Sequence, residues 1–210
     1  KEVAQLGAVL GREFAYEMIE AISPMDGATL QGGLGQLVQA ELLYQRGRPP
    51  QSHYIFKHVL IQDAAYASLL KSTRQQVHQQ IVQVLEMGFP EVAETQPEIM
   101  AHHYMKADLM ESALVYWRRA GEYAVAGSAH MEAIEHLRQG LAVLQTLPDN
   151  LERSQHELML LTTLGSVLMN TQGWADPEVE DIYMRAQALC HQVGKTDQLF
   201  AVMVGLWGGS

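Results

Sequence analysis

The sequence predicts a mainly α-helical protein, and three observations carry this prediction. Apolar residues recur at spacings of three and four along most of the chain, as they do on one face of a helix. Hydrophobic residues make up 48% of the 210 residues, enough for a substantial core, whereas charged residues make up only 18%. Between about residues 41 and 57 the helical spacing gives way to the alternation typical of strands.

Residues 1–40 are expected to form three short helices. Their apolar stripes are Val3, Leu6, Val9 and Leu10, then Phe14, Met18, Ile19 and Ile22, and then Leu30, Leu34, Leu37 and Val38. The second helix should end at Ser23, because a residue that precedes proline disfavours the helical conformation. Gly32, Gly33 and Gly35 weaken the third helix, and we expect them to allow close helix packing.

A β-hairpin is predicted next. ELLYQ (41–45) and HYIFK (53–57) alternate in polarity, and RGRPPQS (46–52) between them is rich in turn-forming residues. Three helices followed by a hairpin is the order of a winged-helix domain. With two further helices, at about 58–70 and 72–87, this predicts a winged-helix domain with flanking helices over residues 1–90.

Residues 91–210 are predicted to form an array of helical repeats similar to tetratricopeptide repeats. The expected helices are 97–107, 109–126, 129–146, 151–171, 177–193 and 196–207. The dipeptides Ala120-Gly121, Leu164-Gly165 and Val204-Gly205 recur at comparable places, which suggests a helical solenoid with small residues at close helix contacts. The small–aromatic spacing of a tetratricopeptide repeat is matched by Ala101, Tyr104, Ala113, Trp117 and Ala120.

Charge and cysteine content favour a soluble, cytoplasmic protein that binds protein rather than nucleic acid. The net charge is −10, and residues 91–210 carry sixteen acidic and seven basic side chains, a balance that repels phosphate backbones. Cys190 has no second cysteine to pair with. The apolar run Leu199–Trp207 is about half as long as a membrane span of roughly 20 residues. Both ends fall inside helical patterns, so we expect a segment of a longer protein.

The sequence predicts neither a catalytic site nor a metal site. GGLGQL (32–37) has glycines but lacks the lysine of a phosphate-binding loop. HELML (156–160) has Leu160 where a zinc-binding helix needs its second histidine, and the adjacent His102 and His103 point in different directions on a helix. We therefore expect no enzymatic activity and no cofactor within this chain.

His58 lies where the predicted strand ends and the next helix begins. A helix N-terminus presents free N–H groups and partial positive charge, so it suits an anion such as phosphate. A histidine there can add a hydrogen bond and, once protonated, a charge. Two interpretations stay open: a packing residue at a strand-to-helix corner, and the sensing residue of a switch.

An aromatic and basic group is the second candidate site. Tyr104, Tyr116, Trp117 and Tyr123 recur at helical spacing, which usually indicates packing between helices. Arg118 and Arg119 beside them could bind an acidic peptide or could form a solvated face. The candidate partner-binding groove therefore consists of five residues, Tyr104, Tyr116, Trp117, Arg118 and Arg119. Core packing is the alternative for the aromatic rings.

Three segments resemble the region after the nucleotide-binding domain in bacterial STAND/AAA-type signalling ATPases. They are GAVLGREFAYEMIEAI (7–22), LGQLVQAELLYQRG (34–47) and YIFKHVLIQDAAYASLLKSTRQQVHQQIVQVLE (54–86). AHHYMKADLMESALVYWRRAGEYA (101–124) and EAIEHLRQGLAVLQTLP (132–148) are similar to the helical repeats that follow there. Such proteins are often fused to class III adenylate/guanylate cyclase or protein kinase domains, so the resemblance implies that the whole protein is an ATPase that can carry a cyclase.

The resemblance also implies a role for His58. The winged-helix domain of this class carries a Met-His-Asp motif whose histidine touches the β-phosphate of ADP. His58 occupies the histidine position, while Lys57 replaces the methionine and Val59 the aspartate. Only the histidine role therefore carries over. ADP or ATP with Mg²⁺ is expected in an ATPase domain outside this chain.

These features together predict a non-catalytic regulatory segment that couples nucleotide state to partner binding. Its expected partners are a protein or peptide, bound by the repeats, and the protein's own ATPase domain; no membrane is involved. The alternatives are a DNA-binding transcriptional regulator and a plain peptide-binding scaffold. DNA binding is disfavoured because residues 27–41, which include the third helix, contain no lysine or arginine.

Overall fold

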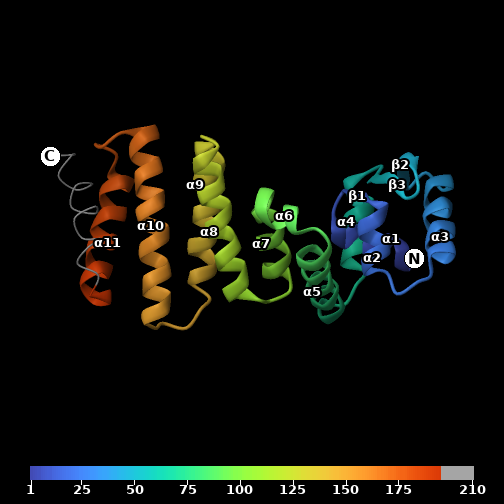
Figure 1. The fold of residues 1–210 in the computed structure, drawn as a ribbon, viewed down its shortest axis with the longest axis horizontal. Helices are drawn as coiled ribbons and strands as arrows, with labels where there is room; N and C mark the ends of the chain where they lie inside the picture. The colour runs from blue at the N-terminus through green and yellow to red at the C-terminus, as the bar shows by residue number, and fades with distance from the viewer. Residues whose placement is uncertain (195–210) are drawn as a thin grey trace. The chain divides into compact units, whose positions relative to one another are not determined.

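The computed structural model describes residues 1–194. In that part of the chain it contains eleven helices and three strands, coloured along the chain in Figure 1. The mainly α-helical fold is therefore confirmed. The chain divides into two compact units, one comprising residues 1–90 and 106–108, the other residues 91–105 and those from 109 onward. The helix predicted for 196–207 lies outside the described residues.

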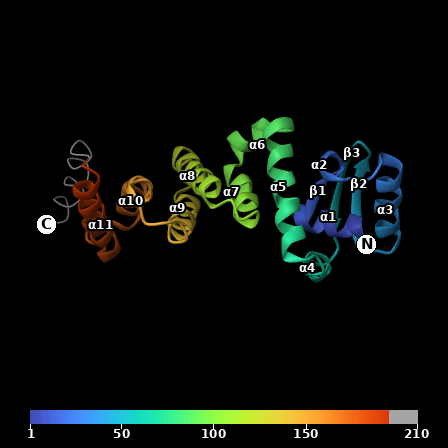
Figure 2. The same ribbon diagram turned by 90° about the horizontal axis from the view of Figure 1, so that it is seen from below.

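The first unit builds a small sheet among its helices. Its elements are α1 (Glu2–Leu10), β1 (Glu13–Ala15), α2 (Tyr16–Ile22), α3 (Gly27–Gln39), β2 (Leu43–Arg48), β3 (Gln51–Phe56), α4 (Val59–Ala67) and α5 (Lys71–Gly88). The sheet is antiparallel, with β3 between β1 and β2 (Figure 2). On β3, Ser52, Tyr54 and Phe56 are buried while Gln51 and His53 are exposed, so one face of the sheet covers the core.

The strand β1 corrects the sequence prediction, which placed Phe14 on a helix. Gly11, with φ of 135°, ends α1, and Phe14 then pairs with Tyr54 in the sheet. The two rings stack with their centroids 5.8 Å apart, and only 5% of Phe14 is exposed. Pairing with a distant strand therefore overrides the helical spacing of Phe14 and Met18.

The hairpin is longer than predicted and its turn is shorter. Register runs from the pair Leu43–Phe56 to the pair Arg48–Gln51, and the turn contains Pro49 and Pro50, joined by a cis peptide bond. Glycine is required at position 47 of β2, because its φ is +79° and a Cβ there would overlap the carbonyl oxygen of Gln51. The arginines predicted to lie in the loop belong to β2 instead.

The core of the first unit gathers side chains from its helices and all three strands. Its buried members include Phe14, Tyr16, Ile19, Leu30, Leu34, Leu43, Tyr54 and Phe56. Burial of each such side chain contributes about 1.5–3 kcal/mol relative to exposure. Among the glycines in the interior of α3, Gly33 lies close to α1, where a Cβ would come within 2.7 Å of Val3, whereas Gly32 and Gly35 face open space.

The second unit contains paired helices. After α6 (Pro90–Thr95) come α7 (Pro97–Lys106), α8 (Met110–Ala126), α9 (His130–Leu144), α10 (Leu151–Gln172) and α11 (Pro177–Val193). Of these, α6 was not predicted, and the others begin and end within about two residues of the predicted bounds. None of the helices in residues 1–194 has both the length and the apolar character that crossing a membrane would require.

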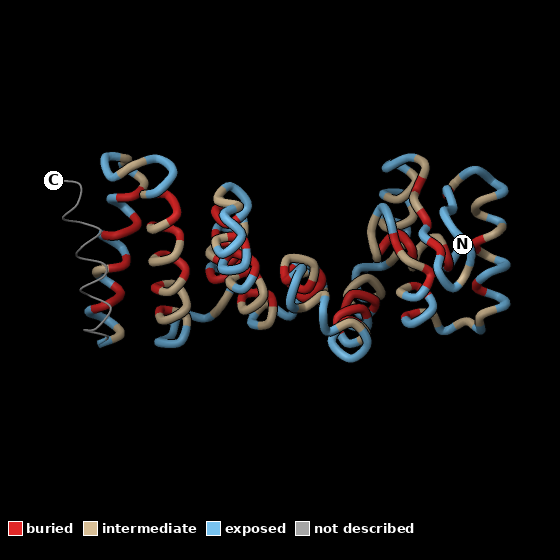
Figure 3. The backbone as a smooth tube through the Cα atoms, turned by 45° about the horizontal axis from the view of Figure 1, so that its top comes forward, coloured by how far each residue is buried: buried red, intermediate tan, exposed pale blue. Residues whose placement is uncertain are grey.

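Glycines permit close approach between successive helices of the second unit. A Cβ at Gly121 on α8 would lie 2.6 Å from Leu137 on α9. A Cβ at Gly165 on α10 would lie 3.0 Å from the ring of Tyr183 on α11. Figure 3 shows buried segments recurring along α10 and α11, as expected for helices that pack along one face. Gly121 and Gly165 thus lie at close helix contacts, as the recurrence of their dipeptides in the sequence indicates.

Candidate functional site

His58 lies at the predicted corner, immediately before α4. Its backbone is extended, with φ of −132° and ψ of 137°, and its side chain makes no capping hydrogen bond to the helix. The side chain is exposed. His58 is therefore not part of the core of the first unit, and both its imidazole and the uncapped helix N-terminus are accessible from outside that unit.

Lys57, beside His58, is held by its own contacts. Its Nζ donates a hydrogen bond to Glu41 Oε2 at 2.9 Å and lies 5.5 Å from the centre of the Tyr44 ring. The hydrogen bond from Lys57 lowers the pKa of the Glu41 carboxyl and raises the pKa of the lysine. Lys57 is thus directed to the start of β2, so of these two neighbours only the His58 side chain is left for an external group.

The helix α4 is amphipathic but has no fully buried residue. Ile61, Ala65 and Tyr66 pack against the core, while Leu60 is 74% exposed and Val59 is 50% exposed. Apolar side chains of this size, next to an accessible histidine, form an outward surface at the start of α4.

The aromatic and basic candidates form two groups rather than one groove. Tyr104 stacks on Tyr116 with a centroid separation of 5.3 Å, and the Arg119 guanidinium lies 5.3 Å from the Tyr116 ring centre. Arg118 forms an ion pair with Glu122, one turn further along α8. Trp117 instead stacks on His136 of α9, with centroids 5.6 Å apart.

Burial separates these five residues further. Tyr104 is 7% exposed and Trp117 is 8% exposed, so both rings pack between helices. Tyr116 and Arg118 are partly exposed, and Arg119 is exposed. Binding of an acidic peptide at this group stays a prediction, and the surface offered for it is Tyr116 with Arg119.

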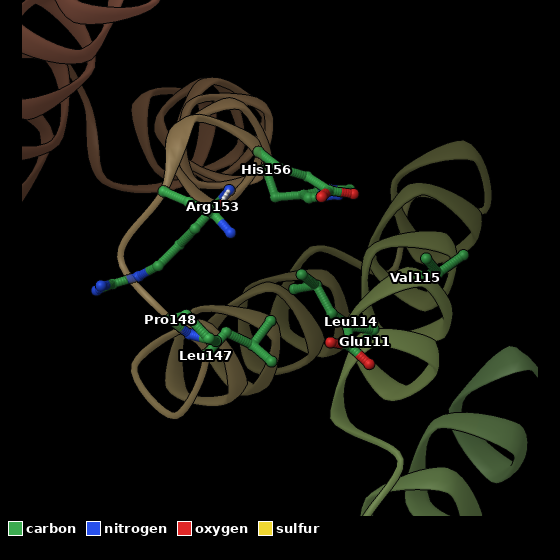
Figure 4. Close-up of a pocket in the computed structure, with 9 residues that line it drawn as sticks. Glu111, Leu114, Val115, Leu147, Pro148, Arg153 and His156 are labelled. Carbon is green, nitrogen blue, oxygen red and sulfur yellow. Dashed lines mark hydrogen bonds between the residues drawn. The ribbon is translucent and has the colours of Figure 1, made fainter.

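A small pocket of about 150 Å³ lies elsewhere in the second unit (Figure 4). It is formed by the start of α8, the α9–α10 connection and the first turns of α10. Arg153 Nε and His156 Nδ1 on its wall are buried without a hydrogen-bond partner among residues 1–194. Because Glu111 and Glu152 also line it, the pocket combines both signs of charge and favours no single class of ligand.

A larger groove of about 480 Å³ lies between α6–α7, α8 and α9. Its lining residues are Thr95, Glu98, Ala120, Tyr123, Ala124, Gly127, Ala129, Glu132 and His136. None of the five residues predicted as a partner-binding groove lines it or the smaller pocket. We call this set of nine residues the acidic groove, because its charged side chains are two glutamates.

Sequence reasoning missed Glu98, Glu132 and His136 of the acidic groove. A signal for the glutamates was present, since each lies in the first turn of its helix and they are 34 residues apart. That separation equals the length of a tetratricopeptide repeat, so the two glutamates would occupy equivalent positions in neighbouring repeats.

Comparison with known proteins gives one relative and no family. No family model matches the chain, and no solved structure matches it. The chain is similar to "Uncharacterized protein R02095" of Rhizobium meliloti (strain 1021), with 25% identity over an alignment that covers 99% of this chain. The chain spans about one fifth of the length of that relative.

Proposed function

We propose that this chain is a non-catalytic regulatory segment of a larger STAND-type signalling ATPase. In this proposal the first unit responds to bound nucleotide, and the second unit binds a protein partner or another part of the same protein. Partner binding then shifts the equilibrium between a closed and an open state, as two ligands do when they prefer different conformations.

The order of elements in the first unit supports a winged-helix interpretation. Helix, strand, two helices and a hairpin follow each other, and the sheet has the order β1-β3-β2. The hairpin is the wing in this interpretation, and α4 follows it. The stacked helices of the second unit are in turn consistent with a tetratricopeptide-like array.

The observation that carries the proposal is the accessibility of His58 at an uncapped helix N-terminus. This arrangement fits a single contact to a phosphate group, because an exposed imidazole lies directly before the positive end of a helix dipole. It does not fit a complete nucleotide site, because the chain has no phosphate-binding loop. ADP or ATP with Mg²⁺ would therefore be held by a domain outside this chain, with His58 completing one contact.

Nucleotide exchange in the full-length protein tests this role. His58→Ala should release bound ADP faster and raise the basal activity, because the closed state loses a contact that the open state does not make. If the protein is only a peptide-binding scaffold, the same variant leaves ADP retention unchanged.

One observation favours an alternative function, which is DNA binding. Arg46 and Arg48 are exposed on β2, where a wing would contact phosphates. However, α3 carries no lysine or arginine, so it lacks the side chains that usually read bases. A salt-dependent shift of duplex DNA in a mobility assay would support the rival, and we expect none.

A further inference from the structure

The two carboxylates of the acidic groove have no basic partner. Elsewhere in the described chain, Glu41, Glu122, Glu157 and Glu178 each form an ion pair with a lysine or arginine. Glu98 and Glu132 form no ion pair or side-chain hydrogen bond within residues 1–194, and no lysine or arginine lines the groove. The groove therefore has a negative potential that its own wall does not neutralise.

The remainder of the groove wall suits an aliphatic stem with a flat head group. Ala120 and Ala124, which are 1% and 7% exposed, provide a narrow, apolar floor. Tyr123 is 52% exposed and offers its ring to the groove. A cation placed over such a ring is attracted by its π-electrons, while the methylene stem of the same side chain covers apolar surface.

His136 makes one wall of the groove rigid. Its ring stacks on the buried Trp117, which holds the imidazole against the α8–α9 contact. Its Nδ1 is buried and has no hydrogen-bond partner among the described residues. The wall is thus preformed by packing, as expected of a binding site that loses little entropy when it is occupied.

From these features we infer that the acidic groove binds an arginine-bearing segment of a partner protein. Arginine fits better than lysine, because a planar guanidinium can stack on an aromatic ring such as Tyr123 and carries five N–H donors for the carboxylates of the groove. This inference rests on the proposed role of the second unit as a binding module. It assigns that role to a surface other than Tyr116, Arg118 and Arg119, and to a partner of opposite charge.

A labelled glycine-serine peptide with three arginines tests the inference on the whole chain, at about 150 mM salt to screen long-range attraction. Glu98→Gln/Glu132→Gln should weaken binding by about tenfold or more, because two charge-assisted hydrogen bonds are lost. Glu111→Gln/Glu180→Gln is the matched control, since these acids also lie in first turns but outside the groove. It should change the affinity by less than about twofold.

Further measurements separate specific binding in the groove from general electrostatic attraction to an acidic protein. Tyr123→Ser should also weaken binding without any change in charge, and it is expected to fold because the ring is half exposed. The same peptide with three lysines should bind more weakly, and one with three glutamates should not bind. Equal weakening by both glutamine pairs, equal binding of lysine, or no binding of the arginine peptide would overturn the inference. Nucleotide retention in His58→Ala is measured separately, so either proposal can fail alone.

Discussion

Single glycines on α3 have different surroundings, although their local sequence is similar. Gly33 lies against Val3 of α1, while Gly32 one position earlier has no atom within 4 Å of where its Cβ would be. A glycine within a helix costs about 0.5–1 kcal/mol relative to alanine. Only Gly33 has a packing reason for that cost, so the two positions form a matched pair.

Alanine substitution at these two positions should change stability in opposite directions. Gly32→Ala is expected to stabilise the first unit by up to about 1 kcal/mol, because it lowers the entropy of the unfolded chain. Gly33→Ala is expected to destabilise it by about 1–3 kcal/mol, because the new methyl overlaps a branched side chain with little freedom to move. Urea unfolding of both variants measures this. The same sign of effect at both positions would show that α1 and α3 are not packed as described.

At the scale of elements, the start of α3 depends on a charged cap. Asp26 accepts hydrogen bonds from the hydroxyl and the backbone N–H of Thr29, and these bonds lower the pKa of its carboxyl. A carboxyl whose pKa is lowered in the folded state contributes stability above its unfolded pKa of about 4. That contribution disappears as the pH falls through the lower, folded-state value.

Asp26→Asn should therefore change the pH dependence of stability more than the fold. Asparagine still accepts the bond from the Thr29 N–H, but it does not titrate. The wild type should be more stable than the variant near neutral pH, and the difference should be smaller at about pH 2. Thermal unfolding at both pH values measures this. A difference that is the same at the two values would contradict the assigned cap.

The contact between α8 and α9 depends on the absence of a side chain at Gly121. Gly121→Ala should destabilise the second unit by about 1–3 kcal/mol, because the new methyl would overlap Leu137. Gly121→Ala combined with Leu137→Ala should lose less stability than the sum of the two single variants, since the shortened side chain makes room. Gly88→Ala on α5, where a Cβ meets open space, is the control. Strict additivity in denaturant unfolding would argue against this contact.

Much of the arrangement of helices could be predicted from the sequence, because periodicity and turn residues are local signals. The starts of α10 and α11 follow from the N-caps Asn150 and Asp176, and their lengths follow from the apolar spacing after each cap. The strand β1 could not be predicted, because Phe14 is placed by its partner Tyr54, forty residues away in the chain. The acidic groove was missed for a similar reason, since it exists only where three separate segments meet.

At the scale of the whole molecule, the proposed function depends on a protein larger than this chain. The relative from Rhizobium meliloti is about five times as long as this chain. A regulatory segment would contact domains outside itself, and the exposed start of α4 and the unpaired carboxylates of the acidic groove are two surfaces suited to such contacts. They lie in different units, so each can be altered without changing the other.

The rate of ADP release from the full-length protein tests the central claim most directly. His53→Ala is the matched control, because His53 is also an exposed histidine of the first unit but lies on β3 rather than at the start of α4. The account predicts faster ADP release and higher basal activity for His58→Ala, with both unchanged for His53→Ala. Equal release rates for the wild type and His58→Ala would contradict a role for this corner in sensing nucleotide.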